Sequence, residues 1–417
     1  MRALLLPLGL ALWTAPAFAA DVRGTATTLL SGRQDPRQGD TVNVVPLYEL
    51  LSVEATKLEL PGADEARLVF NGWGRVQLGE DEVTADHSAD LNLLYLEANR
   101  GPATLRLGRQ HLVLGVGRME LIDGLDARVR APLGLMAEAF AGYTVHPELN
   151  LRTDSWSSGG RLSHNLAAWD WVGEVGASYL QRRKDSQVVR HEVGFDGFTR
   201  IGMTNVVAGA ILDPQREALV EARGRLEVVP NDRVSVAANV ERVTPSLLLP
   251  VNSIFTVFAD ADHLSVGGAL RITPTPFWTF DLTGDSLSLD QDTIGYRAAL
   301  GVVSYREAQH RSAIGMEARR LKENENGYLR GRIFTTLALT ETLKLSADVY
   351  ALQFDEPIND VDQSMLGQFS AVYDLATNLR LAATVAGGST PWAKSQIEGM
   401  LRFAYGYDID FSREVAP

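Results

Sequence analysis

The chain has 417 residues, no cysteine and a formal net charge of −13 at pH 7. The lack of cysteine excludes a disulfide framework, thiol chemistry and a cysteine-ligated metal site, and the negative charge argues against nucleic acid as a partner. No stretch beyond the first twenty residues has the roughly 18 consecutive apolar residues that a membrane-spanning helix needs.

The first residues, MRALLLPLGLALWTAPAFAADV, have the three parts of a secretory signal peptide. Arg2 provides a positive start, residues 4–13 form a short apolar run, and residues 17–19 make a small-x-small cleavage site. We therefore expect residues 1–19 to be removed on export. Residues 20–417 show no break in composition, and we expect them to form a single domain.

Most of the remaining chain repeats one unit, an alternating run of roughly 9 to 14 residues followed by a turn. In residues 218–245, Arg223 and Arg225 share one parity, whereas Val220 and Leu226 share the other. Alternation of period two predicts β-strands. About 22 such runs can be recognised, and we expect about 18 to 22 strands.

The energetic cost of burying charge decides which face meets lipid. If Arg223 and Arg225 contacted the bilayer near its midplane, each would cost ~2–4 kcal/mol, so the parity of Val220 and Leu226 is expected to face lipid. About twenty strands are too many for one β-sandwich, and the repeat of a β-propeller is missing. The sequence therefore predicts an all-β fold, an antiparallel transmembrane β-barrel of the outer membrane.

The connections between runs alternate in length, which is typical of outer-membrane barrels with short periplasmic turns and longer outer loops. An even number of strands places both termini at the short-turn rim. Trp169, Trp171 and Trp278 stand beside short turns and predict an aromatic girdle. The short connections are at 230–232, 274–276, 340–341 and 376–377, and the longer or acidic ones are at 79–90, 322–327 and 355–363.

The alternation departs from its pattern at two places in the first third of the chain. The parity slips at Leu93–Leu94, which indicates a β-bulge, and it breaks again near Arg109.

A barrel of this size would be about 40 Å across and needs an infolded segment to narrow it. The most apolar loop, PSLLLPVNSIFTVFADA at 245–261, is expected to fold inward or to contact a partner.

The inner parity carries charges of both signs on neighbouring runs, which predicts a ladder of cross-strand ion pairs on the wall of a wet channel for polar solutes. Trp73, between Asn71 and Arg75 on the same parity, adds an aromatic surface on which a sugar ring can stack. The residues expected to line the lumen are Trp73, Arg75, Arg106, Asp126, Arg128, Arg130, Glu221, Arg223, Arg225, Glu241, Arg271, Asp281, Arg297, Arg319, Arg330, Arg332, Asp348, Arg380 and Arg402.

No catalytic set emerges from the sequence. His263 and Ser265 resemble the His-x-Ser strand pair of outer-membrane phospholipases, but no Asn or Asp can be assigned to orient the histidine. His191-Glu192 lacks the second histidine of a zincin motif. We therefore expect a protein that is not an enzyme and that holds no metal and no cofactor.

The stretch LRLGRQHLVLGVGRMELIDGLDARVRAPLGLMAEAFAGY, residues 105–143, resembles a pattern of large porin-like outer-membrane barrels, namely alginate-export-type barrels and the exopolysaccharide-secretion barrels of myxobacteria-like bacteria. The matching residues are Gly108, Arg109, Gln110, Asp123, Gly124 and Arg128. The resemblance implies that a polymer passes through a charged lumen and is delivered by periplasmic proteins. The alginate-export relatives have a strongly basic lumen, whereas the signs here are mixed, which argues against an alginate-like substrate.

Three functions are compatible with these observations: a polysaccharide-export channel, a diffusion porin for small solutes, and a barrel that anchors an envelope-spanning motility or adhesion complex. The expected partners are outer-membrane lipid and lipopolysaccharide, a polysaccharide or small polar solute, and periplasmic export or envelope-complex proteins.

Overall fold

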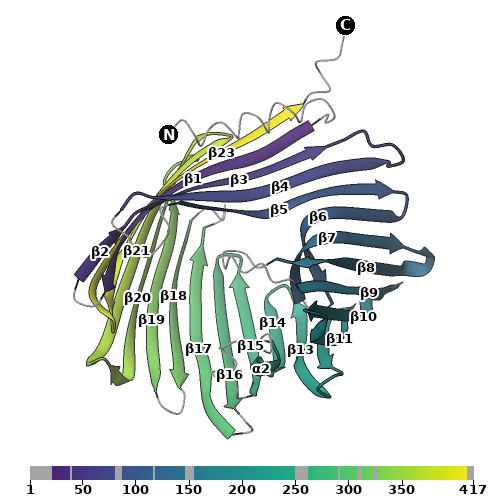
Figure 1. Cartoon of the computed structure of the whole chain (residues 1–417). Coiled ribbons are helices and arrows are strands. Elements are labelled where there is room, and N and C mark those ends of the chain that lie inside the picture. Colours follow the sequence, from purple (N-terminus) through teal and green to yellow (C-terminus); the bar gives the residue numbers. More distant parts are fainter. Residues whose placement is uncertain are drawn as a thin grey trace.

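The computed structural model describes residues 21–37, 40–79, 87–115, 118–145, 155–248, 262–289, 292–307, 312–322 and 326–410. These residues form one antiparallel sheet of 23 strand segments. Segments β2 and β3 both pair with β1 and continue one another, so the wall has 22 strands. Strand β1 also pairs with β23, which closes the sheet into a barrel (Figure 1). The predicted fold class and strand number are confirmed.

Two short helical segments, η1 (Pro132–Gly134) and α2 (Pro245–Leu248), accompany the strands. Among the described residues no helix is long and apolar enough to cross a membrane. The strands are β1 (Asp21–Arg37), β2 (Asp40–Val44), β3 (Pro46–Thr56), β4 (Glu65–Gln77), β5 (His87–Arg100), β6 (Ala103–Leu114), β7 (Arg118–Arg130), β8 (Leu135–Thr144), β9 (Ser155–Ala168), β10 (Trp171–Lys184), β11 (Gln187–Ile201), β12 (Thr204–Asp213), β13 (Ala218–Asn231), β14 (Val234–Val243), β15 (His263–Thr275), β16 (Trp278–Leu289), β17 (Asp292–Arg306), β18 (Ala313–Lys322), β19 (Gly327–Ala338), β20 (Leu343–Ile358), β21 (Val361–Ala376), β22 (Leu379–Thr390) and β23 (Ala393–Asp410).

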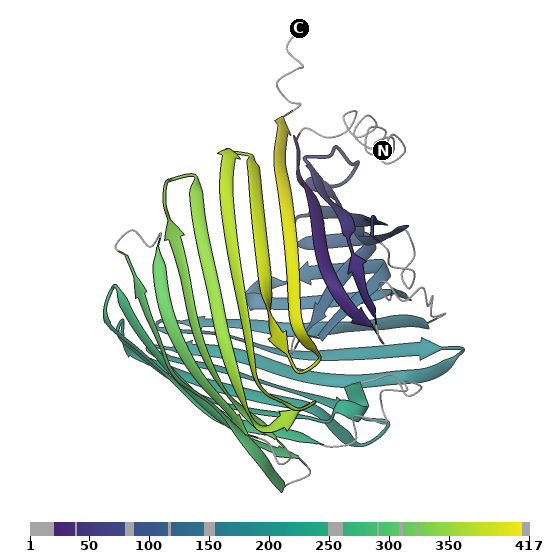
Figure 2. The ribbon, with the colours of Figure 1, turned by 90° about the vertical axis from the view of Figure 1, so that its left-hand side faces the viewer.

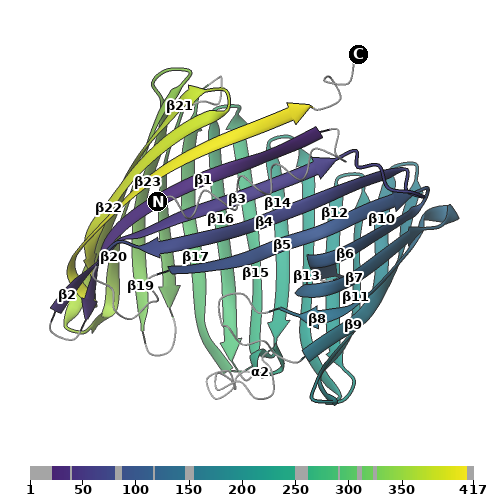
Figure 3. The ribbon, with the colours of Figure 1, turned by 45° about the horizontal axis from the view of Figure 1, so that its top comes forward.

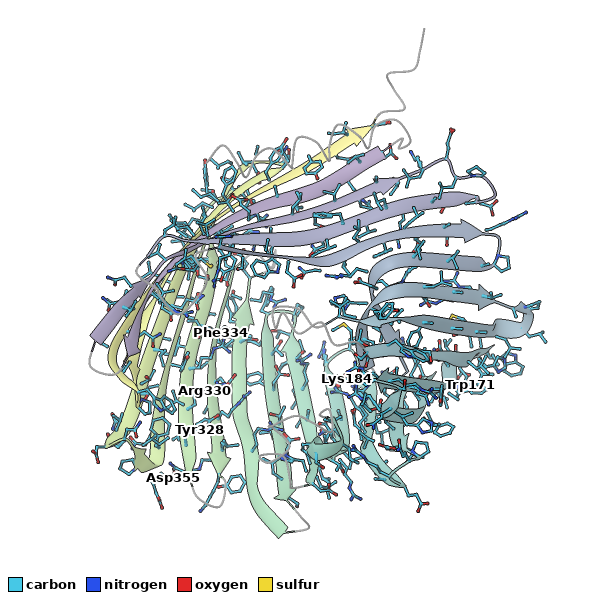
Figure 4. The ribbon with its side chains drawn as sticks, viewed as in Figure 1. Trp171, Lys184, Tyr328, Arg330, Phe334 and Asp355 are labelled. Atoms are coloured by element: carbon cyan, nitrogen blue, oxygen red, sulfur yellow. The ribbon has the colours of Figure 1, made fainter. Side chains whose placement is uncertain are left out.

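Between the bulges, the register of the strands keeps each parity on one face of the sheet. Arg225 lies opposite Asn239, and Leu226 lies opposite Ala238. Leu226 is 44% exposed, and many apolar side chains of the same parity on other strands are exposed too. This large exposed apolar surface requires lipid around it. The opposite face is polar and points inward, as Arg330 and Phe334 do in Figure 4.

The two rims differ only in part as expected. The connection expected to be long at 355–363 is the two-residue turn Asn359–Asp360 between β20 and β21, and a longer connection, residues 57–64, lies at the rim of the termini. Strands β1 and β23 lie side by side (Figure 2), and their ends at Asp21 and Asp410 pair with each other at one rim. Because the strands alternate in direction, the four short connections named above lie at this rim and the longer ones lie at the other. Trp169, Trp171 and Trp278 also lie at the rim of the termini, where Trp278 contacts Tyr305 at a ring-centroid distance of 5.2 Å.

A bulge of the expected kind occurs in β5. The register between β4 and β5 shifts beside Asn71, because Asn92 is an extra residue whose side chain bonds that of Asn71. This position is next to the predicted slip at Leu93–Leu94.

One predicted side-chain orientation is wrong. The register between β12 and β13 shifts beyond Ile211, so that Val220 has no partner in the ladder. Its side chain is only 1% exposed and packs against Ile211 instead of facing lipid. A bulge reverses the parity for one residue, which alternation alone does not reveal.

The expected infolding of residues 245–261 can be followed only at its start. Leu247 and Leu248 of α2 pack against Ile211 and Val220, and the carbonyl oxygen of Leu248 accepts a hydrogen bond from Arg190 of β11 at 2.9 Å. Residues 249–261 lie outside the described residues, so their infolding stays a prediction.

Candidate functional site: a charged lumen and an infolded hairpin

Charged side chains on the inner face of β1 to β6 form a connected ladder of ion pairs. Glu54 joins Arg23 at 2.8 Å and Arg67 at 3.0 Å. Glu97 then joins Arg67 at 2.9 Å and Arg106 at 2.6 Å. Each carboxylate therefore lies between two arginines, so that neighbouring strands are held together by charge-assisted hydrogen bonds.

The ladder continues across β7 to β11. Asp126 lies opposite Arg106 in the strand register. Arg128 contacts Glu138 at 3.1 Å. Further on, the largely buried Arg161 joins Glu174 at 2.6 Å and Asp196 at 2.5 Å. This side of the lumen is a continuous polar wall in which most charges are paired and partly buried.

The opposite side of the lumen, from β13 to β20, holds its charges more openly. The arginine side chains in these pairs are about one-fifth to two-thirds exposed, so they present charge to water in the lumen. The pairs are Arg223–Glu221 at 3.9 Å, Arg225–Glu227 at 3.8 Å, Arg271–Asp281 at 2.6 Å, Arg297–Asp285 at 3.4 Å, Arg330–Glu317 and Arg332–Asp348 at 2.5 Å.

The strand register places all the residues expected to line the lumen on the inner face. Those not mentioned so far lie in this way: Trp73 and Arg75 on β4, Arg130 at the end of β7, Glu241 opposite Arg223, Arg319 opposite Arg330, Arg380 opposite Ala404 and beside Asp374, and Arg402 opposite Leu29. They surround the whole lumen and do not converge on one point.

Trp73 has an aromatic neighbour that the sequence did not reveal. Tyr48 of β3 lies 6.1 Å from it between ring centroids, with the two rings inclined at 52°. Trp73 is half-buried and lies opposite Leu50 on β3 and Asp90 on β5. The inner face of β3 to β5 thus offers an aromatic surface with carboxylate and amide groups beside it.

The largest departure from a plain barrel is the hairpin of β6 and β7. Strand β6 pairs with β5 only between Ala103 and Arg109, whereas its pairing with β7 continues to Leu114. On the N-terminal side of Leu94, the described ladder pairs of β5 are all with β4. Strands β5 and β6 diverge at this point (Figures 1 and 3).

Glycines make the bend possible. Gly108 has φ of +124°, and a Cβ there would lie 2.2 Å from the carbonyl oxygen of Leu94. Gly124 lies directly opposite on β7, and a Cβ there would lie 2.2 Å from the carbonyl oxygen of Ala141. A side chain at either position would clash with backbone, so the bend requires glycine.

The end of the hairpin packs against the inner face of the barrel. Leu112 of β6 and Ile122 of β7 form a buried cluster with Phe140 of β8 and Leu180 of β10, and Ile122 is 0% exposed. Because inward-facing side chains of a single-layered wall would contact water in a lumen this wide, the burial requires a second layer. Burying each of these side chains stabilises the packed hairpin by ~1.5–3 kcal/mol.

A polar clasp holds the same hairpin. Glu120 of β7 is 2% exposed and pairs with Arg182 of β10 and with Arg190 of β11, the latter at 3.1 Å. Arg190 also donates to the carbonyl oxygen of Leu248. One guanidinium therefore connects the infolded hairpin with the inward turn of α2.

Arg109 closes the base of the hairpin. Its guanidinium makes two hydrogen bonds of 2.8 Å to Asp123 and a third of 2.8 Å to the carbonyl oxygen of Leu91 on β5. It therefore satisfies a backbone acceptor at the point where β5 and β6 separate.

Glu120, Arg182 and Arg190 are not among the functional residues that the sequence predicts. The available signals were the parity break near Arg109 and a mixed face of polar and apolar residues from Gln110 to Ile122. In the described part of the chain no three His, Asp or Glu side chains group as metal ligands do. His263 is the first residue of β15 and is exposed.

Three solved structures show what this geometry is similar to. A mutant ferric enterobactin receptor, PfeA of Pseudomonas aeruginosa, has a TM-score of 0.57 at 10% identity, over 93% of this chain and 81% of that one. The siderophore receptor PirA of the same organism has a TM-score of 0.56 at 13% identity, over 92% and 80%. A P pilus tip assembly intermediate of E. coli, PapC-PapD-PapK-PapG, has a TM-score of 0.54 at 11% identity, over 93% and 61%.

This chain has the fold of a large outer-membrane β-barrel. No protein-family model matches it, and no curated protein sequence is detectably similar to it. At these identities the likeness extends to the fold alone, and the resemblance to alginate-export-type barrels stays a prediction.

Proposed function

We propose that this protein is an outer-membrane channel that passes a saccharide or another polar solute, with polysaccharide as the favoured substrate. Residues 1–19 direct export across the inner membrane and are removed on export. Periplasmic proteins deliver the substrate, and the protein performs no chemistry on it.

The observation that carries the proposal is the aromatic pair Trp73–Tyr48 on a wall that carries many ion pairs. A sugar ring presents an apolar face that stacks on an aromatic ring and hydroxyl groups that bond to charged and amide side chains. A small inorganic ion needs no such surface. The mixed signs of the charges favour a neutral or weakly charged saccharide over a strongly acidic one.

The infolded hairpin adds a second argument. A closed barrel of 22 strands is about 44 Å across between backbones, which is wide enough to leak many solutes. The hairpin end and α2 occupy part of this space along β8 to β13. They leave the solute a narrower path in front of the ion pairs of β13 to β20.

Replacing Trp73 by Ala tests the saccharide proposal. Stacking on an aromatic side chain contributes ~1–3 kcal/mol, and a sugar ring belongs at the low end. We therefore expect the concentration of maltohexaose that half-blocks the single-channel current in planar bilayers to rise about five- to tenfold. Phe334→Ala is the matched control, because Phe334 is an inner-face aromatic stacked with Arg332 on the far wall.

An unchanged blocking concentration in Trp73→Ala, or an equal rise in both variants, would contradict a saccharide site at Trp73.

A further inference from the structure

The outer face of β9 to β11 differs from the rest of the lipid-facing wall. On the inner face of β10, Leu180 packs in the buried cluster with the hairpin, and Arg182 pairs with Glu120. Successive residues of a strand point to opposite faces. Tyr179 and Arg183 therefore point outward, and Tyr179 is 41% exposed.

Arg183 has aromatic and polar neighbours on this outer face. Trp156 of β9 lies directly opposite Arg183, and the guanidinium carbon lies 5.8 Å from its ring centroid. The Nε of Arg183 donates to the side-chain oxygen of Gln181 at 3.0 Å. His191 of β11 lies opposite Gln181 and contacts Tyr179 edge to face at 5.4 Å between ring centroids. These five residues form an outer-face cluster with guanidinium, amide and imidazole groups side by side.

The charge of Arg183 is not neutralised as that of comparable arginines is. Arg242 and Arg320 also belong to the lipid-facing parity close to the same rim. Arg242 pairs with Asp262 at 2.7 Å, and Arg320 makes two hydrogen bonds of 2.6 Å to Asp355. In the described part of the chain, no carboxylate lies within ion-pair distance of Arg183, whose contacts are with amide and aromatic groups. Its positive charge is therefore available to an anion from outside the chain.

The position of the cluster along the strands corresponds to the level of lipid head groups. Arg183 stands just before the turn at 185–186, at the rim opposite to the termini, which in outer-membrane barrels is the outer one. Further along the strands the same face is apolar, and Leu162, Val175 and Phe195 are 67%, 52% and 51% exposed. A charged side chain is costly at the bilayer midplane but not near the interface. The outer-face cluster thus lies above a surface that suits acyl chains.

We propose that the outer-face cluster binds the phosphorylated saccharide head group of a glycolipid of the outer leaflet, the chemistry of lipopolysaccharide. Arg183, Gln181 and His191 bond to a phosphate group, because phosphate oxygens accept several hydrogen bonds and a guanidinium matches their geometry. Trp156 contacts a sugar ring together with Tyr143, which lies opposite it on β8 and is 68% exposed. The site is outside the barrel and does not depend on the solute that the lumen passes.

Lipid binding to the mature protein in detergent tests the proposal, with native mass spectrometry as the measurement of Kd. The probes are diphosphoryl lipid A, which carries sugars and phosphates, and monogalactosyl diacylglycerol, which carries a sugar and no phosphate. The test variant is Arg183→Gln. The matched control is Arg242→Gln, which removes the same charge from the same face and rim, where an acidic partner neutralises it.

We expect Arg183→Gln to raise the Kd of lipid A about fivefold or more, because a charge-assisted hydrogen bond is lost, and to leave the Kd of monogalactosyl diacylglycerol unchanged. Arg242→Gln should leave both values unchanged. An unchanged Kd of lipid A in Arg183→Gln, or an equal rise in the two variants, would overturn the site.

Two further measurements test the lipid nature of the ligand. Trp156→Leu, which keeps an apolar side chain at the rim, should raise the Kd of lipid A because the sugar ring loses its aromatic contact. A large molar excess of inorganic phosphate should not displace lipid A, since it has neither sugar nor acyl chains. Displacement by inorganic phosphate would show a simple anion site, and an unchanged Kd in Trp156→Leu would contradict recognition of the saccharide.

Discussion

Removing the end of the β6–β7 hairpin is expected to raise the single-channel conductance several-fold. In this variant Gln110–Ile122 is replaced by Asn-Gly, a sequence suited to a two-residue hairpin turn, so that Arg109 and Asp123 still pair at the base. The described residues of the deleted segment, 110–115 and 118–122, pack on the inner wall, where Leu180, Arg182 and Arg190 hold them. The conductance of a pore is limited by its narrowest section. Removal of the inner layer widens that section, so the conductance rises.

A shortened hairpin in the wall itself provides the control. Replacing residues 354–362 at the tip of β20 and β21 by Asn-Gly removes a comparable length of rim and no inward-folded element. We expect nearly unchanged conductance in this control. Equal conductance of both variants and the wild type would show that the hairpin does not constrict the path.

Replacing Glu120 by Ala is expected to release the hairpin without removing it. Glu120 is buried, and its carboxylate neutralises Arg182 and Arg190, whose side chains are themselves largely buried. Removing one partner of a buried ion pair costs ~3–5 kcal/mol where the remaining charge loses its compensation, as Arg182 does here, whereas Arg190 keeps Glu192 at 3.1 Å. We expect a clearly lowered urea midpoint and a noisier, larger current, since the hairpin would leave the inner wall for part of the time.

The matched control for that variant is Glu221→Ala. Glu221 meets the more exposed Arg223 at 3.9 Å in the open half of the lumen, where an ion pair contributes only ~0–1 kcal/mol. Equal effects of the two substitutions on the urea midpoint would contradict the role of Glu120 as a clasp.

Alternation of polar and apolar residues was sufficient to predict the wall of the barrel. Leu226 could be assigned to lipid and Arg223 to the lumen because a charged side chain is costly in the bilayer, and the strand register agrees with both assignments. The bulge in β5 was also recognisable, because one extra residue shifts the parity of everything that follows it.

The inner layer could not be predicted in the same way. Leu112 and Ile122 share a parity with Gln110 and Glu120, a mixture that suits neither lipid nor an open lumen. This mixture suits a face that packs against another surface of mixed polarity, but the sequence does not identify that partner surface. The partners Leu180, Arg182 and Arg190 lie about sixty to seventy residues away in the chain and become neighbours only through the bend at Gly108 and Gly124.

Release of saccharides from liposomes tests the central claim most directly. The mature protein is reconstituted into liposomes loaded with maltohexaose, and efflux is compared with that from liposomes containing the Trp73→Ala variant and from protein-free liposomes. We expect rapid efflux through the wild type and a changed concentration dependence in the variant. Liposomes that retain maltohexaose as protein-free ones do, with the barrel folded and inserted, would contradict a saccharide channel.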